Sequence, residues 1–182
     1  MIIYIINQYA TSLKDGIGGR HYYLSKELSS MGHTVYLIVA NNTHLRHSNV
    51  SKKNDKELEL INGVKFFYIK TLKYKKSTDI RRIINWFIFS WKISKLNRFI
   101  GRKADVIIVS SPSLVSFLGA FNLSKRLKAK LFFDVRDIWP LSIIQLRGFT
   151  NKNLFIRILQ FIEKKAYQHS DIVTSSIKYS YM

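Results

Sequence analysis

Two turns in this sequence combine residue types that can hold an anion or move a proton. In the first, Gly16, Gly18 and Gly19 precede Arg20 at the start of a helical pattern. Glycine lets a ligand approach the backbone closely, and the amino end of a helix favours an anion. The spacing does not match a dinucleotide-binding fingerprint. We therefore predict an anion-binding turn, with a turn that serves only the chain reversal as the alternative.

The second turn is the charged segment that begins at Asp134 and ends at Pro140. It follows a predicted strand directly, so Arg136 and Asp137 are expected at the carboxyl edge of the sheet, where open α/β sheets bind ligands. The alternative is a structural ion pair between these two residues, with Trp139 packed on the core. Ser111 follows another predicted strand, but no nucleophile-elbow glycines flank it, so serine hydrolysis is not supported.

Short apolar runs form the elements that must position these turns. Six of them predict buried strands: Ile2–Ile6, Thr34–Ala40, Val64–Ile69, Asp105–Ser110, Lys130–Val135 and Asp171–Thr174. They lack strict alternation, which is typical of parallel strands covered on both faces. Helical periodicity lies between them and predicts an α/β fold, a doubly wound, mostly parallel sheet with helices on both faces. The polar stretch 41–62 has no period and is predicted to be a loop with one short helix at most.

Composition excludes several classes of protein. The 182 residues include 30 Lys and Arg, 11 Asp and Glu and no cysteine, which excludes disulfides and thiolate chemistry. A hydrophobic fraction of 47% excludes intrinsic disorder, and the length predicts a single domain, 1–182. The net charge of +19 predicts a polyanionic partner, which could be nucleic acid, an acidic membrane or a phosphorylated ligand. His44 and His47 have no acidic residues to assist them, so no metal site is predicted.

Four motifs in order resemble a known family. They are Gly18-Gly19-Arg20, Met31-Gly32-His33-Thr34-Val35, Val135-Arg136-Asp137-Ile138-Trp139-Pro140 and Ser170-Asp171-Ile172-Val173. Together they span almost the whole chain and resemble the amino-terminal, acceptor-side domain of GT-B-fold glycosyltransferases of family 4. The subgroup that is most similar builds lipopolysaccharide O-antigen or capsule and includes fucosaminyltransferase-like enzymes. Many relatives have His at the position of Arg136, so a His-type catalytic role is not carried over.

The resemblance implies a function for the two turns. It implies transfer of a sugar from a nucleotide sugar to a saccharide acceptor, which in this subgroup is linked to a lipid diphosphate. It also implies retention of configuration and no cofactor or metal. Asp137 would be catalytic and would orient or deprotonate the acceptor hydroxyl. Gly18, Gly19, Arg20, Arg136 and Ser111 would bind substrate. The donor-binding domain of such enzymes carries paired glutamates that are not found here, so we expect a fragment that is inactive alone.

A basic and aromatic segment, 70–103, suggests a membrane surface. It holds eleven Lys and Arg against Asp79 alone, and a helix is predicted over Ile80–Ile100. Two apolar stripes follow this helix: Ile80, Ile84, Phe87 and Trp91, and Trp86, Phe89, Ile93, Leu96 and Ile100. One stripe is enough to cover the sheet, so we expect the second to be exposed, with membrane contacts from Arg82, Trp86, Phe89, Lys92 and Ile93.

Three functions remain open on the sequence. The first is a cytoplasmic transferase bound peripherally to the inner face of the plasma membrane, with a nucleotide sugar, a saccharide acceptor and anionic lipid as partners. The second is a basic nucleic-acid-binding module, for which no recognised motif is present. The third is a non-catalytic membrane adaptor. An alternative for the second stripe is burial beneath a loop or against a further domain.

Overall fold

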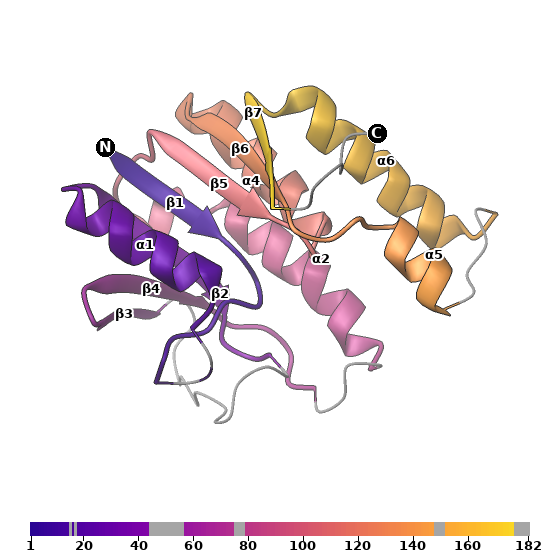
Figure 1. Ribbon diagram of the computed structural model, residues 1–182, viewed down its shortest axis with the longest axis horizontal. Coiled ribbons are helices and arrows are strands. Elements are labelled where there is room, and N and C mark those ends of the chain that lie inside the picture. Colours follow the sequence, from indigo (N-terminus) through magenta and orange to yellow (C-terminus); the bar gives the residue numbers. More distant parts are fainter. Residues whose placement is uncertain (15, 17, 44–56, 75–78, 148–151, 177–182) are drawn as a thin grey trace.

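Seven strands form a single sheet in the part of the chain that the structure describes. The computed structural model describes residues 1–14, 16, 18–43, 57–74, 79–147 and 152–176. The strand order is β3-β4-β2-β1-β5-β6-β7 (Figure 1). The strands are β1 Ile2–Ile6, β2 Thr34–Ala40, β3 Glu57–Ile61, β4 Val64–Ile69, β5 Val106–Ser110, β6 Lys130–Val135 and β7 Ile172–Ser175.

The sheet is parallel except at one edge, where β3 pairs antiparallel with β4. From β1 the chain adds β2 and β4 on one side and β5, β6 and β7 on the other. The direction of winding therefore reverses between β1 and β5. At such a switch point the connections leave the two strands in opposite directions, which opens a crevice at their carboxyl ends.

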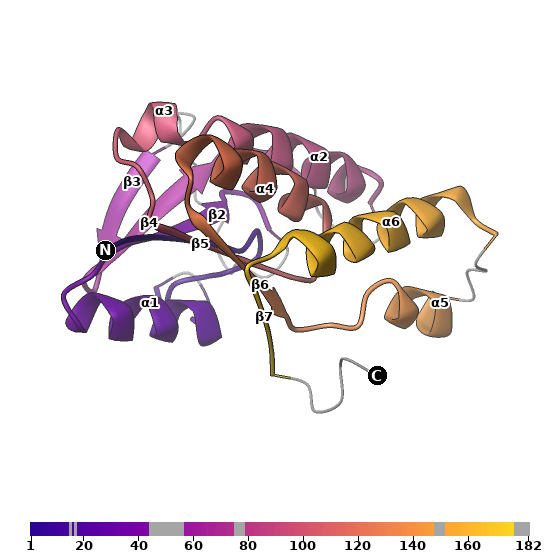
Figure 2. The ribbon, with the colours of Figure 1, turned by 90° about the horizontal axis from the view of Figure 1, so that it is seen from above.

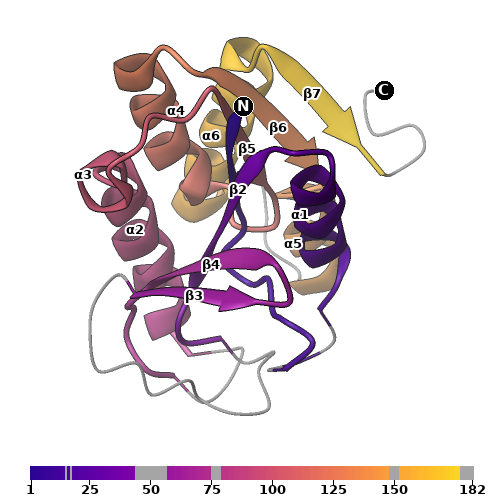
Figure 3. The same cartoon turned by 90° about the vertical axis from the view of Figure 1, so that its left-hand side faces the viewer.

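Helices cover both faces of the sheet, as Figure 2 and Figure 3 show. Helix α1 (Arg20–Ser30) lies on one face, while α2 (Arg81–Ser94), α4 (Val115–Leu127) and α6 (Leu154–His169) lie on the other. Alternate residues of β1 serve the two cores, because Ile3 and Ile5 pack on the α1 side and Tyr4 and Ile6 on the opposite side. The predicted doubly wound, Rossmann-like α/β fold is thus confirmed.

Close packing of α2 on α4 depends on one glycine. A Cβ atom added at Gly119 would lie 2.1 Å from the carbonyl oxygen of Ser90, a distance that no side chain tolerates. The amide of Gly119 also donates to the Ser90 hydroxyl at 2.9 Å. The two helices therefore approach at backbone distance, which fixes α2 against α4.

The stretch predicted as a loop contains a strand that the sequence analysis missed. Glu57–Ile61 forms β3, and Asn62-Gly63 connects it to β4 with φ angles of 48° and 82°. Two successive residues with positive φ are what a two-residue type I′ hairpin requires, and Asn-Gly is its preferred sequence. Helix α5 (Leu141–Arg147) was also not predicted.

The helix predicted over Ile80–Ile100 is divided in two. Helix α2 ends at Ser94, and the short α3 (Asn97–Ile100) follows. At the junction the amides of Lys95 and Leu96 bond to carbonyls three residues earlier, which tightens the turn and breaks the helical ladder. Among the described residues, no helix is both long and apolar enough to cross a bilayer.

The expected exposure of the second stripe on this helix is wrong. Trp86 is 3% exposed, and Phe89 and Ile93 are fully buried against the sheet. The first stripe, Ile80, Ile84, Phe87 and Trp91, is the one that faces outward. The buried face also carries Asn85, whose amide bonds both backbone groups of Leu72, and this pairing fixes the rotation of α2. Trp86, Phe89 and Ile93 are therefore core residues, not membrane contacts.

Candidate functional site

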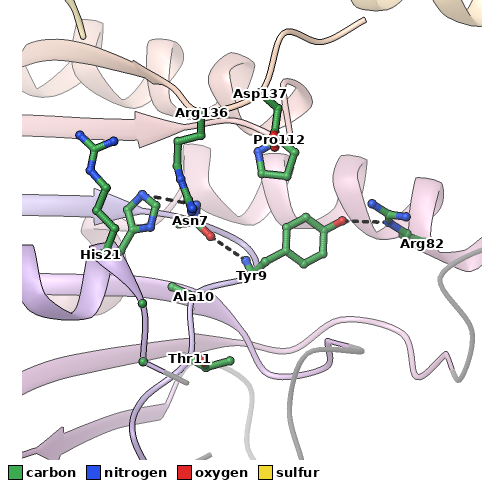
Figure 4. Close-up of a pocket in the computed structure, with 12 residues that line it drawn as sticks. Asn7, Tyr9, Ala10, Thr11, His21, Arg82, Pro112, Arg136 and Asp137 are labelled. Carbon is green, nitrogen blue, oxygen red and sulfur yellow. Dashed lines mark hydrogen bonds between the residues drawn. The ribbon is translucent and has the colours of Figure 1, made fainter. Parts of the chain in front are cut away.

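A cavity of about 430 Å³ opens at the switch point between β1 and β5. Five segments line it: Asn7, Tyr9, Ala10 and Thr11 after β1; Gly18–His21 at the start of α1; Arg82 on α2; Pro112 after β5; and Arg136 and Asp137 after β6. The expected juxtaposition of the Gly18–Arg20 turn and the Arg136–Asp137 turn at this edge is confirmed. Figure 4 shows the side chains of both walls converging on the space between them.

The Gly18–Arg20 turn brings the amino end of α1 to the cavity. Gly18 and Gly19 have φ angles of 77° and 81°, a conformation that other residues rarely adopt. A Cβ at Gly18 would press on the Leu13 side chain at 3.0 Å, whereas one at Gly19 would meet nothing. Of the side chains that the structure describes, none caps α1. Its first amide groups therefore remain as donors for an anion at this wall.

Beneath this turn lies a buried hydrogen-bonded network centred on Asp134. Its Oδ1 atom lies 3.1 Å from the Arg20 guanidinium and accepts from the Thr174 hydroxyl at 3.2 Å. Its Oδ2 atom accepts from the Ser110 hydroxyl at 3.0 Å. Burial alone would raise the pKa of Asp134, but the bonds from His21 and Ser110 and the charge of Arg20 hold that pKa below its ordinary value. The carboxylate is thus ionised and ties β5, β6, β7 and α1 together.

His21 continues this network to the cavity wall. Its Nε2 atom lies 2.7 Å from the Ser110 oxygen and 3.6 Å from Asp134. The same atom lies 3.5 Å from the Asn7 amide nitrogen (Figure 4). Because the Ser110 hydroxyl donates to Asp134, its oxygen accepts from His21, which places the imidazole proton on Nε2. Burial lowers the pKa of His21, and the positive charges of Arg136 and Arg20 add to this effect against the opposing influence of Asp134. His21 is therefore neutral at physiological pH.

The Arg136–Asp137 turn is held by its backbone and leaves its side chains available. The Ser111 hydroxyl accepts from the amides of Arg136 and Asp137 at 2.8 and 3.1 Å. Ser111 is 1% exposed and does not line the cavity, so the structure corrects its expected substrate contact to a role in shaping the turn. The Arg136 and Asp137 side chains are exposed and make no hydrogen bond or ion pair with the described residues. The alternative of a structural ion pair between them is wrong.

Tyr9 and α2 form the remaining wall. The Tyr9 hydroxyl accepts from Trp86 Nε1 at 2.6 Å and from Arg82 Nε at 3.3 Å. The Arg82 guanidinium also lies 5.6 Å from the centres of both aromatic rings. Trp86 in turn contacts Trp139 edge-on. Two residues predicted as membrane contacts, Arg82 and Trp86, thus form one wall of the cavity and its support.

The charges around the cavity suit an anionic ligand beside a hydroxyl group. Arg20, Arg82 and Arg136 supply three cations, of which Arg20 is paired with Asp134. Among the described residues, Asp137 is the single carboxylate that lines the space. Guanidinium groups and helix-end amides bind phosphate oxygens well, and an unpaired carboxylate can accept a proton from a hydroxyl. The arrangement can therefore hold a phosphate group and polarise an alcohol in the same cavity.

The sequence analysis did not propose Asn7, Tyr9 or Ser110 as site residues, and it placed His21 and Asp134 in the two turns without giving them a role in binding. Asn7, Ser110 and Asp134 are polar residues at the ends of otherwise apolar strands, a signal that could have identified them. Nothing in the sequence pairs Tyr9 with Arg82, which are 73 positions apart. His44 and His47 lie outside the described residues. Within the described part of the chain, no group of three or more His, Asp or Glu residues could hold a metal ion.

Comparison with known proteins adds no assignment to this geometry. No model of a known protein family matches the chain, and no curated protein matches it. Any function must therefore be argued from the cavity and its residues.

Proposed function

We propose that this chain is the acceptor-side domain of a GT-B-fold glycosyltransferase of family 4, acting in surface polysaccharide synthesis. The observation that carries the proposal is the meeting of the amino end of α1, Arg136 and Asp137 in one cavity at the switch point of the sheet, with neither side chain paired to any described residue. The four ordered motifs support the same assignment, since two of them line the cavity. The nucleotide sugar would be bound mainly by a second domain.

The chemistry of transfer matches the charges available. The acceptor hydroxyl oxygen forms a bond to the anomeric carbon of the sugar while the bond from that carbon to the diphosphate oxygen breaks. The hydroxyl proton must leave, and negative charge develops on the departing diphosphate. Asp137 is placed to orient the hydroxyl or accept its proton, and Arg136 with the first amides of α1 is placed to stabilise an anionic group.

Arg20 has a supporting part in this proposal. Its guanidinium is held by Asp134, so it cannot swing freely toward a ligand as Arg136 can. It contributes a fixed positive charge at the edge of the cavity. The acceptor would be a saccharide linked to a lipid diphosphate, whose phosphates match the arginine-lined wall. Such an acceptor would place the protein on the inner face of the plasma membrane.

Calorimetric titration of the 182-residue chain with inorganic pyrophosphate tests the site directly. We expect binding that Arg136→Ala weakens strongly and that Lys26→Ala, which removes an exposed cation from α1, leaves unchanged. Absence of binding, or equal weakening by both variants, would contradict the anion site.

Transfer activity is tested on the protein encoded by the whole reading frame, supplied with a panel of nucleotide sugars and lipid-linked acceptors. Asp137→Asn should lower kcat by about 10²-fold or more, the usual contribution of an acid or base in the transition state. Glu27→Gln on the exposed face of α1 is the matched control. The 182-residue chain alone should transfer no sugar, and transfer by it would refute the acceptor-side assignment.

A nucleic-acid-binding module is the second candidate, favoured by the net charge of +19. Contacts to a phosphate backbone are numerous and nearly equivalent, so removal of any one cation should weaken binding by a similar amount. Under the transferase proposal, Arg136→Ala should weaken pyrophosphate binding far more than Lys26→Ala does. The pyrophosphate titration therefore distinguishes the two candidates as well.

A further inference from the structure

The outer side of α2 carries a line of large apolar side chains exposed to solvent. Ile80 is 66% exposed, Ile84 44%, Phe87 48% and Trp91 58%. Their spacing of four, three and four residues places all four on one side of the helix, opposite the buried Phe89 and Ile93. We call these four residues the α2 outer stripe. At 1.5 Å per residue it extends about 16 Å along the surface.

Positive charge surrounds this stripe. The Lys95 ammonium lies 3.9 Å from the centre of the Trp91 ring. Lys92 donates to the carbonyl oxygen of Lys70. Arg126 of α4 donates to the carbonyl oxygen of Ser94 at the end of α2 and to the side chain of Asn97 in α3. Between residues 70 and 103 the single acid is Asp79, which pairs with Arg81 at 3.5 Å. A surface of this kind presents apolar groups and cations together.

We propose that the α2 outer stripe docks on an anionic lipid bilayer, with Phe87 and Trp91 entering the headgroup boundary and the surrounding Lys and Arg contacting acidic headgroups. Aromatic and aliphatic side chains set among basic ones are typical of helices that lie in the plane of a membrane interface. Protein–protein interfaces are instead depleted of Lys. Nucleic acid offers no environment for Ile80 and Ile84, which are aliphatic.

Docking on this side also orients the cavity. Arg82 lies on the same helix as the stripe and lines the cavity wall. At 3.6 residues per turn, Arg82 lies about 200° around the helix from Ile80, on the side opposite the stripe. A bilayer on the outer side of α2 would therefore be separated from the cavity wall by about one helix diameter, 10–12 Å, which a lipid-linked diphosphate would have to span. This consequence rests on the proposed function, whereas the docking itself does not.

Co-sedimentation with vesicles tests the docking. The chain is mixed with vesicles of phosphatidylcholine alone or with added phosphatidylglycerol. We expect binding only to the anionic vesicles, and weakening as the screening length falls from about 10 Å at 0.1 M salt to about 3 Å at 1 M. Phe87→Ser/Trp91→Ser should reduce the partition coefficient about tenfold or more, because both apolar insertions are lost.

The matched control is Tyr23→Ser/Leu60→Ser, which removes two side chains of similar exposure from α1 and from the edge strand β3. It should bind anionic vesicles as the wild type does. Circular dichroism and thermal melts establish that both double variants are folded, as expected for exposed positions. Lys92→Ala/Lys95→Ala should reduce binding to anionic vesicles at low salt and have little effect at high salt.

Four results would overturn the proposal. They are equal binding to neutral and anionic vesicles, no binding to either, an unchanged partition coefficient in Phe87→Ser/Trp91→Ser, and equal loss in the control. If the wild-type chain self-associates in gel filtration and binds no vesicles, and Phe87→Ser/Trp91→Ser is monomeric, the stripe would be assigned to contact with a second copy. Loss of oligonucleotide binding in the same variant, again without vesicle binding, would assign it to nucleic acid. Failure of these tests leaves the pyrophosphate site unaffected, so the two proposals are separable.

Discussion

The two turns that form the cavity are built in opposite ways. At the Gly18–Arg20 turn the side chain of Arg20 is bound to buried Asp134, and His21 continues into the same network. At the Arg136–Asp137 turn it is the backbone that is fixed, by Ser111, while neither side chain is paired with another residue in the described part of the chain. One turn is thus part of the folded framework, and the other presents groups that a ligand can engage. Substitutions in the two turns should separate stability from binding.

The largest effect is expected at Asp134. Asp134→Ala removes a buried carboxylate and leaves the Ser110 hydroxyl and His21 without their partner. The free energy of unfolding should fall by about 3 kcal/mol, as for the loss of one member of a buried charged network. Urea denaturation measures it. Asp137→Ala, the exposed counterpart, should change stability by less than about 0.5 kcal/mol; similar losses in both variants would remove the contrast between the turns.

Replacement of Arg136 should weaken binding strongly and leave stability unchanged. Arg136→Ala should weaken pyrophosphate binding by about tenfold to a hundredfold, the range for loss of a charge-assisted hydrogen bond, with an unchanged urea midpoint. Arg20→Ala should weaken binding less and lower stability more, because its guanidinium is already paired with Asp134. Calorimetry and denaturation on the same two variants give both quantities. The contrast fails if Arg20 proves the more important of the two for binding.

Replacement of Ser111 should affect both stability and pyrophosphate binding. Ser111→Ala leaves the amides of Arg136 and Asp137 without their acceptor, so stability should fall by about 1–2 kcal/mol. Pyrophosphate binding should weaken as well, because the turn is no longer held in one shape. Ser30→Ala removes an exposed hydroxyl that bonds the Glu27 carbonyl and should be nearly neutral. Unchanged binding in Ser111→Ala would show that the turn does not need this bond.

The smallest effect concerns pH. Burial lowers the pKa of His21 in the folded protein, whereas in the unfolded chain His21 has its ordinary pKa of 6.5. Below pH 6.5 the unfolded chain therefore binds a proton at His21 more readily than the folded protein does. Protonation therefore favours unfolding, and stability should decline as the pH falls from about 6.5 toward the lowered pKa of folded His21. His21→Gln keeps a nitrogen donor for Ser110 but does not titrate. Melting temperatures across this range should decline less steeply in the variant, and parallel curves would exclude His21 as the source.

Much of the fold could be predicted from local sequence, because buried parallel strands need unbroken apolar runs. All six predicted strands exist, with bounds that differ by a residue at most, but the prediction that all are buried is wrong for β7, whose four residues are exposed. Strand β3 was missed, although the Asn62-Gly63 dipeptide is the strongest short hairpin signal. Its leucines point outward, with Leu58 53% and Leu60 67% exposed, so its alternation did not indicate an inner face. Strands at the edge of a sheet, which pair with one neighbour, show the weakest pattern of buried apolar residues in the sequence.

The sequence by itself determined which turns would meet, since the carboxyl ends of parallel strands share one edge of a sheet whatever the packing around them. It could not determine how each side chain is engaged there, because Ser110, Asp134 and Thr174 come from three strands and contact one another only in the folded sheet. Nor could it decide which stripe of α2 is buried. Both stripes are apolar, so hydrophobicity does not distinguish them. The choice follows from the contact of Gly119 with Ser90 and the bonds from Asn85 to Leu72 and from Trp86 to Tyr9, all of which are specific tertiary contacts.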